Sequence, residues 1–402
     1  MPWNRTNPEK ERMAFVVERE QRSRSMTALC WSYGVSRRTG YRWLSRVAAE
    51  GPAGCKERSR APKRHPQAVP KRILQVIVET RLTHPTWGPR KILAFRREQE
   101  PESRWPAAST IGAILGQEGL VQPRRRRRAS PPYGQPFQTC RDPNDVWCAD
   151  FKGWFRTGDG VRCDPLTITD ACSRMLLRGV ALLAPTYANV RPVFEAAFRE
   201  YGLPLAIRTD NGPPFATLAA GGLSSLSVWW LKLGIQPERI EPGHPEQNGR
   251  HERMHRTLKA ETASPPAGDC REQQARFDAF QAEYNCVRPH EALGQRPPAT
   301  LYVPSSRPYP TTLLEFTYPY ADLVRRIRSS GDIRWRQHSI FVSEVLGGET
   351  VGLYHRSEET WEVRFGPIVL GVFRAHDAPP RLRRPEPPRP YGPVGAHDER
   401  KV

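Results

Sequence analysis

The sequence lacks the paired cysteines that would indicate a disulfide framework or a zinc ribbon. Its eight cysteines are scattered, and none belongs to a CxxC pair. No apolar run approaches the roughly 18 residues of a membrane span, and the N-terminus has no apolar signal-peptide core. We therefore expect a cytoplasmic protein with reduced thiols and no membrane association.

Further absences narrow the chemistry. No Walker loop and no Ser-His-Asp pattern is evident, so the sequence implies neither an ATP requirement nor a small-molecule substrate. Residues 1–140 contain no aspartate and hold 28 Lys and Arg against 11 Glu, whereas the remaining residues hold 34 basic and 31 acidic side chains. Most of the net charge of +20 therefore lies in the N-terminal part, which indicates binding to a polyanion such as DNA.

Residues 1–52 are predicted to form a helix-turn-helix DNA-binding domain. Gly34 permits the turn, Ser36 caps the following helix, and Tyr41 and Leu44 are expected to pack inside. An ordinary helical hairpin is the alternative, but a basic helix after such a turn suits the major groove of DNA. The candidate DNA contacts on this helix are Arg37, Arg38, Arg42 and Arg46.

The next segments continue this basic region. Residues 53–69 are predicted to be a basic linker, residues 70–122 a second helix-turn-helix domain, and residues 123–140 an Arg-rich linker. A run of five arginines is too charged to pack and is expected to bind the phosphate backbone: Arg124, Arg125, Arg126, Arg127 and Arg128.

Residues 141–305 read as three consecutive strands followed by helix, strand, helix and strand. This order predicts a mixed α/β domain. Short alternating runs in residues 306–376 predict a small β-barrel, and the Pro-rich residues 377–402 a disordered tail. The fold class is thus a multidomain α/β protein with all-α N-terminal units.

Three carboxylates in this region lie beside predicted strand ends or turns. Asp150 ends a strand-like run, Asp210 follows another, and Glu246 comes directly after a proline that suits the first turn of a helix. Carboxylates are the ligands that Mg²⁺ prefers, and two such ions can stabilise both the attacking and the leaving oxygen of a phosphoryl transfer.

The flanks and the spacing of these carboxylates are specific. Thr-Asp-Asn-Gly surrounds Asp210, His-Pro-Glu-Gln-Asn-Gly-Arg surrounds Glu246, and 35 residues separate the two. This arrangement resembles the catalytic core of retroviral integrases and of bacterial insertion-sequence transposases, the DDE superfamily. The resemblance implies a ribonuclease H-like core in which Asp150, Asp210 and Glu246 hold two Mg²⁺ or Mn²⁺ ions and catalyse the reaction.

The same resemblance implies the substrate and the assembly. The protein is expected to be a DNA transposase that binds the terminal inverted repeats of its element, cleaves at their ends and joins them to target DNA. Arg250 and Arg253 share the helical face of Glu246 and are expected to contact the DNA end. A homo-oligomer on double-stranded DNA is expected because two ends are processed together, and the protein is expected at the nucleoid.

Three alternatives remain open. The sequence His-Glu-Arg-Met-His from His251 to His255 matches a zinc-peptidase pattern in which Glu252 is the general base. The arginines of this helix and the lack of an evident third ligand argue against it, and both histidines are expected to face away from Glu246. Asp170 competes for a metal role, although we prefer a structural one. The chain could also be a DNA-binding repressor with an inactive core.

Overall fold

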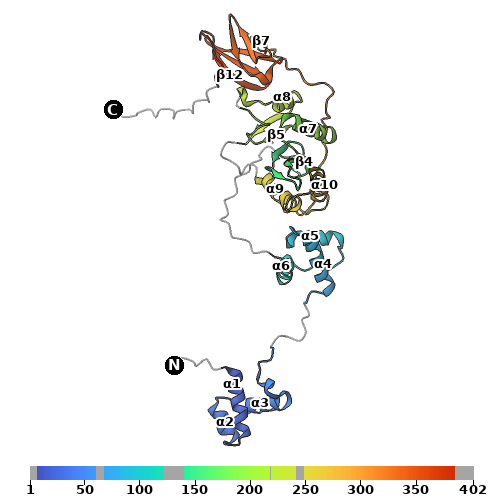
Figure 1. Ribbon diagram of the computed structural model, residues 1–402, viewed down its shortest axis with the longest axis vertical. Coiled ribbons are helices and arrows are strands. Elements are labelled where there is room, and N and C mark those ends of the chain that lie inside the picture. The colour runs from blue at the N-terminus through green and yellow to red at the C-terminus, as the bar shows by residue number, and fades with distance from the viewer. Residues whose placement is uncertain (1–6, 60–67, 122–139, 218, 241–248, 385–402) are drawn as a thin grey trace, which may run out of the picture. The chain divides into compact units, whose positions relative to one another are not determined.

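The computed structural model describes residues 7–59, 68–121, 140–217, 219–240 and 249–384 (Figure 1). Its contacts divide the chain into two units, residues 1–69 and residues 70–402, and each is described by itself. Within the described ranges, no helix combines the length and the apolar character needed to cross a membrane.

The first unit is a three-helix domain that contains the predicted helix-turn-helix. Its helices are α1 (Pro8–Glu20), α2 (Met26–Ser32) and α3 (Arg37–Glu50). Gly34 occupies the turn with a φ of +64°, a conformation that glycine adopts without a steric penalty. The Ser36 side chain accepts a hydrogen bond from the Thr39 amide and so caps α3, as the sequence predicts.

Two details of this unit differ from the sequence analysis. Tyr41 is 50% exposed, and Trp43 instead packs edge-on against the buried Phe15, with ring centroids 5.9 Å apart. The first residues of the predicted linker 53–69 are folded, because they belong to a short 3-10 helix (Gly51–Cys55) in which Cys55 is buried. Arg12 donates to the Cys55 carbonyl at 3.0 Å and fastens this turn to α1.

Three more helices open the second unit, as predicted. They are α4 (Lys71–Thr83), α5 (Pro89–Gln99) and α6 (Ala108–Gln117). Pro89 stands in the first turn of α5, where its missing N–H costs no hydrogen bond. Ile77, Ile92 and Ile111, one from each helix, are fully buried.

A mixed sheet forms the centre of the second unit. Its strands are β1 (Val146–Phe151), β2 (Phe155–Arg156), β3 (Arg162–Asp170), β4 (Leu176–Leu182), β5 (Ala206–Thr209) and β6 (Gln236–Arg239). β3 pairs antiparallel with β1, β2 and β4, whereas β5 pairs parallel with β1 and β6. Three antiparallel strands continued by parallel strands after helical crossovers are the ribonuclease H-like arrangement that the sequence analysis expects.

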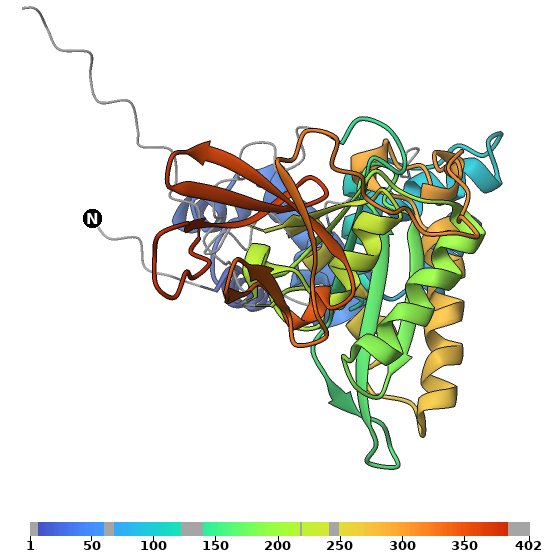
Figure 2. The same cartoon turned by 90° about the horizontal axis from the view of Figure 1, so that it is seen from above.

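Helices cover both faces of this sheet (Figures 1 and 2). The helices are α7 (Tyr187–Tyr201), α8 (Ser225–Lys232), α9 (Gly249–Thr262) and α10 (Cys270–Cys286). Trp147 of β1 packs with α7 and α8, and Leu176 of β4 packs with α9 and α10. Because side chains alternate along a strand, Cys148 and Asp150 point to the face opposite Trp147, where α9 lies.

The C-terminal region contains two further sheets. Its strands are β7 (Leu323–Arg326), β8 (Asp332–Trp335), β9 (His338–Phe341), β10 (Thr350–Ser357), β11 (Thr360–Phe365) and β12 (Ile368–Arg374). Hydrogen bonds run in the order β12, β11, β10, β7, and β8 pairs with β9 separately. The predicted barrel is not confirmed, because β12 and β7 remain opposite edges among the described strands and do not close the sheet.

Gly202, which ends α7, supplies a first testable prediction. Its φ is +76°, and a Cβ there would lie 2.6 Å from the Ser305 carbonyl oxygen. Gly160 also has a positive φ, of +82°, but open space around it. We expect Gly202→Ala to lower the free energy of unfolding by about 1–3 kcal/mol more than Gly160→Ala, because only the first adds a steric clash. Equal losses in urea unfolding would contradict this account.

Candidate active site

Asp150 and Asp210 come from neighbouring parallel strands. The pairing of β1 with β5 sets Val146 opposite Ala206 and Cys148 opposite Arg208, a constant offset of 60 residues. The pairing ends at Cys148 and Arg208, two residues before Asp150 and Asp210 respectively. Because the two strands run parallel, both aspartates follow the paired segment at the same edge of the sheet.

The surroundings of Asp210 fit a divalent cation. Its Oδ1 is buried and has no hydrogen-bond partner among the residues that the structure describes. Burial raises the pKa of Asp210, while a hydrogen bond from the Gly212 backbone opposes this rise. A buried carboxylate oxygen without a partner is costly, and a Mg²⁺ or Mn²⁺ ion shared with Asp150 would compensate its charge.

The third predicted carboxylate cannot be placed in this geometry. Glu246 lies outside the described residues, and α9 is described from Gly249 onward. Its role as a metal ligand therefore stays a prediction.

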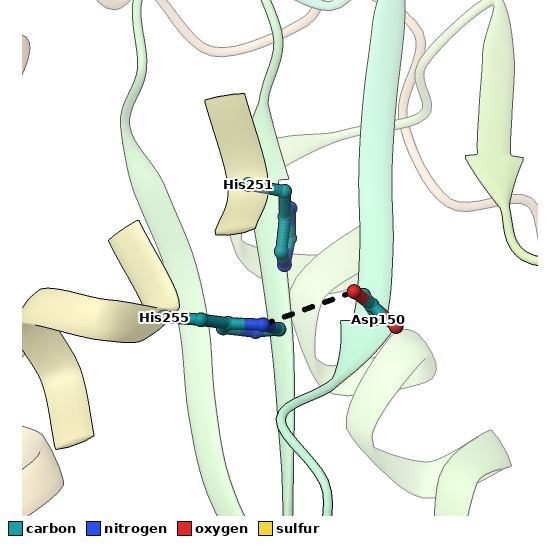
Figure 3. Close-up of side chains that lie close together, drawn as sticks. All are labelled: Asp150, His251 and His255. Carbon is teal, nitrogen blue, oxygen red and sulfur yellow. Dashed lines mark ion pairs between the residues drawn. The ribbon is translucent and has the colours of Figure 1, made fainter. Parts of the chain in front are cut away.

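The inner face of α9 carries two buried histidines. His251 is 4% and His255 is 2% exposed, and they share this face with Met254 and Leu258. Ligand atoms of Asp150, His251 and His255 all lie within 4.8 Å of one another (Figure 3). Both histidines thus lie beside one of the proposed catalytic carboxylates.

This proximity is not predicted from the sequence. The angles around the helix place both histidines away from Glu246 but do not indicate which side of the helix meets the sheet. The spacing of His251, Met254, His255 and Leu258 is that of a buried helical stripe, and this signal could have revealed it.

Two threonines of β3 anchor these histidines. Thr167 Oγ1 lies 2.6 Å from Nε2 of His251 and 2.6 Å from Nε2 of His255. Thr169 Oγ1 lies 3.1 Å from Nδ1 of His251. α9 is therefore fixed to the strand next to β1 by hydrogen bonds as well as by apolar packing.

The peptidase alternative does not fit this arrangement. In that chemistry a glutamate next to the first histidine must reach the zinc-bound water. Glu252 is exposed while both histidines are buried, and both Nε2 atoms contact Thr167.

The buried histidines predict a loss of stability in mild acid. Burial lowers the pKa of His251 to about 3 and that of His255 to about 2, so the contact of His255 with Asp150 is not an ion pair at neutral pH. Unfolded histidine titrates near pH 6.5, and below this pH the unfolded chain binds protons that the folded chain excludes. The contribution of the two neutral histidines to the free energy of unfolding is therefore fully present above about pH 6.5 and is lost as the pH falls toward their folded-state pKa values.

We expect the free energy of unfolding to fall by up to about 1.4 kcal/mol per pH unit for each of these histidines between about pH 6.5 and pH 5. Urea unfolding at several pH values measures this slope. His251→Gln should reduce it, whereas His338→Gln at an exposed position should not. A slope that is unchanged in His251→Gln would argue against this explanation.

Asp170, the competing carboxylate, accepts hydrogen bonds that stabilise the turn after β3. It is 1% exposed, and its oxygens accept from the Asn144 amide at 2.8 Å and from the Ser173 amide and hydroxyl at 2.7 Å each. These bonds occupy both oxygens and agree with the structural role preferred in the sequence analysis.

The predicted DNA-binding arginines have different positions. Arg37, Arg38 and Arg42 are exposed on α3, whereas Arg46 donates to the Lys56 carbonyl at 2.8 Å and thereby holds the end of its own domain. Arg253 is exposed on α9. The run from Arg124 to Arg128 and the side chain of Arg250 lie outside the described residues. All these DNA contacts stay predictions.

Comparison with solved structures finds integrase cores of low similarity. The catalytic core of BIV integrase is 21% identical, with a TM-score of 0.31, and covers 40% of this chain and 93% of that one. The catalytic core of HTLV-2 integrase, in complex with magnesium, is 16% identical with a TM-score of 0.33. The match to it covers 40% of this chain and 98% of that one.

Comparison with other sequences is more informative. An uncharacterised 39.2 kDa protein of insertion element IS476 from Xanthomonas euvesicatoria is 29% identical over 56% of this chain and 62% of its own length. The transposase InsD of insertion element IS2 from Escherichia coli is 28% identical over 53% of this chain and 72% of its own length. The match thus spans less than two thirds of the Xanthomonas protein.

Family comparison matches three regions of the chain, and the first of them extends across the boundary between the two structural units. A homeodomain-like domain family matches residues 39–115, and two integrase core domain families match residues 141–245 and residues 233–298. The family matches and the insertion-element relatives thus indicate the same class of protein. The chain therefore contains an integrase core domain that follows a homeodomain-like region, and the relatives that it resembles come from insertion elements.

Proposed function

We propose that this protein binds the terminal inverted repeats of an insertion sequence, cleaves at the element ends and joins the freed 3′-hydroxyl to target DNA. The observation that carries the proposal is the parallel pairing of β1 with β5, which ends two residues before both Asp150 and Asp210. The buried Oδ1 of Asp210 has no hydrogen-bond partner within the described ranges, which supports a cation bound by the two aspartates.

The chain itself contributes mainly position and charge to this reaction. Asp150 and Asp210, with Glu246, would hold two Mg²⁺ or Mn²⁺ ions, which activate the attacking oxygen and stabilise the leaving 3′-oxygen. Because both aspartates follow paired strands, they would need little reorganisation in the transition state. A phosphoryl transfer of this kind requires no covalent protein nucleophile.

The exposed basic residues would hold the DNA. Arg37, Arg38 and Arg42 on α3 suit the major groove of a terminal repeat, and Arg253 on α9 suits a backbone phosphate near the carboxylates. Because two element ends are joined in concert, the working form is a homo-oligomer assembled on DNA.

The test is a cleavage assay with the full-length protein. Labelled DNA carrying the inverted repeats that flank the gene is incubated with Mg²⁺, with Mn²⁺ and with EDTA. We expect metal-dependent nicks that leave a 3′-hydroxyl at the element ends, followed by joining to a target plasmid. Binding without cleavage in either metal would instead identify a repressor with an inactive core.

A further inference from the structure

His255 uses its two ring nitrogens differently. Its Nε2 lies 2.6 Å from Thr167 Oγ1, inside the contact between α9 and the sheet. Its Nδ1 faces Oδ2 of Asp150 at 3.8 Å, which exceeds hydrogen-bond distance (Figure 3). One nitrogen therefore fixes the helix, and the other is directed at a proposed metal ligand.

His251, one helical turn earlier, has both nitrogens engaged by threonines. Its Nε2 lies 2.6 Å from Thr167 Oγ1, and its Nδ1 lies 3.1 Å from Thr169 Oγ1. Of the two histidines, His255 is the one that turns a nitrogen toward Asp150.

The hydroxyl of Thr167 determines the tautomer of His255. This hydroxyl has one hydrogen, which it donates to the Asp150 carbonyl at 3.3 Å. With this hydrogen engaged, we assign its two lone pairs as the acceptors of Nε2–H from both imidazoles, whose Nε2 atoms lie 2.6 Å away. In this tautomer Nδ1 of His255 is a lone-pair acceptor that faces a carboxylate oxygen. Two acceptors face each other favourably when a cation lies between them.

The distance between these acceptors fits that arrangement. Bonds of about 2.1 Å from one divalent ion place two ligand atoms roughly 3.0 Å apart at a right angle and roughly 4.2 Å apart on opposite sides, so a separation between these values suits a wide angle at the ion. Nδ1 of His255 and Oδ2 of Asp150 are 3.8 Å apart. Resting on the proposed function, we propose that His255 is a further ligand, through Nδ1, of the divalent ion held by Asp150.

A nitrogen ligand changes which ion the site prefers. Oxygen-only sites suit Mg²⁺, whereas imidazole favours the transition metals, Mn²⁺ the least of them. We therefore expect the protein to bind Mn²⁺ more tightly than Mg²⁺, by a larger ratio than a carboxylate-only site would give.

The test measures binding of Mn²⁺ alone to the full-length protein, by calorimetry and by electron spin-echo modulation from ¹⁴N. His255→Gln keeps a polar group near the position of Nε2 for Thr167 but removes the δ nitrogen. His255→Asn keeps an oxygen or nitrogen near the position of Nδ1 but loses Thr167. Circular dichroism confirms that each variant is folded.

Native protein should show imidazole ¹⁴N modulation of bound Mn²⁺. His255→Gln should abolish it and weaken Mn²⁺ binding about tenfold or more. His255→Asn should lose the imidazole signal but keep more of the affinity than His255→Gln. His251→Gln is the matched control and should keep both the signal and the affinity, because its nitrogens face threonines.

The outcomes separate this inference from the proposed function. One outcome would overturn the ligand role and leave the carboxylate centre intact. In this outcome Mn²⁺ binding depends on Asp210, shows no imidazole signal and is unchanged in His255→Gln. Equal losses in His251→Gln and His255→Gln would assign the histidines to packing and also overturn it. Absence of Mn²⁺ binding by native protein, with or without terminal-repeat DNA, would overturn both the ligand role and the metal centre.

Discussion

Asp210→Asn is expected to lower both DNA cleavage and joining by about a thousandfold or more. The substitution keeps the shape of the side chain but removes the charge that would bind a divalent ion. Transition-state stabilisation by such an ion amounts to several kcal/mol, and each 1.4 kcal/mol or so is a factor of ten in rate. The rate constant of single-turnover cleavage, with saturating Mg²⁺ and terminal-repeat DNA, measures the effect.

Two matched controls show what the loss means. Asp142→Asn removes a charge from an exposed position outside the site and should leave cleavage unchanged. Binding of Asp210→Asn to terminal-repeat DNA should also be unchanged, because the proposed DNA contacts are elsewhere. If Asp210→Asn cleaved within tenfold of native protein, the assignment of this carboxylate to the reaction would be wrong.

Arg288→Met is expected to cause a large loss of stability. Arg288 is 4% exposed and donates to Glu261 of α9 at 2.8 Å and to the Thr86 hydroxyl at 3.0 Å. Methionine leaves the largely buried Glu261 carboxylate without its cation. Breaking a buried ion pair from one side costs about 3–5 kcal/mol, and urea unfolding measures the change in the free energy of unfolding.

An exposed ion pair serves as the comparison. Arg199 and Glu195 form a pair one turn apart on α7, with 63% and 33% of their side chains exposed. Arg199→Met should cost less than about 1 kcal/mol because water screens the exposed pair. Adding Glu261→Gln to Arg288→Met should recover part of the lost stability, because the uncompensated charge is then removed. Similar losses for Arg288→Met and Arg199→Met would contradict the assignment of Arg288 as a buried anchor.

Local patterns allowed much of the architecture to be predicted. Ser36 as a helix cap and Gly34 in the turn depend on neighbouring residues only, and both are found. The order of strands and helices in residues 141–240 follows from hydrophobic periodicity over short windows. The prediction that Tyr41 is buried was wrong because α3 has two adjacent apolar sectors. The sector that contains Trp43 packs against Phe15, and this leaves Tyr41 exposed.

The candidate site also combines residues that local patterns predict with contacts that only the folded chain creates. Motifs and spacing selected Asp150 and Asp210, and the parallel pairing of β1 with β5 places them at the same edge of the sheet. The sequence did not predict the partners of Arg288, because Glu261 and Thr86 are 27 and 202 residues away in the chain. Spacing along the sequence does not encode pairs of this kind.

By itself, the sequence determined which carboxylates, turns and basic helices the protein has, because these depend on residue type and on short spacings. The tertiary structure decided which face of α9 meets the sheet, and so placed His251 and His255 beside Asp150 rather than in solvent. The reason is physical. Met254 and Leu258 must be buried, and a helix that buries them also buries every side chain on the same stripe. Thr167 of β3, distant in sequence, supplies the hydrogen bonds that make this burial acceptable for histidine.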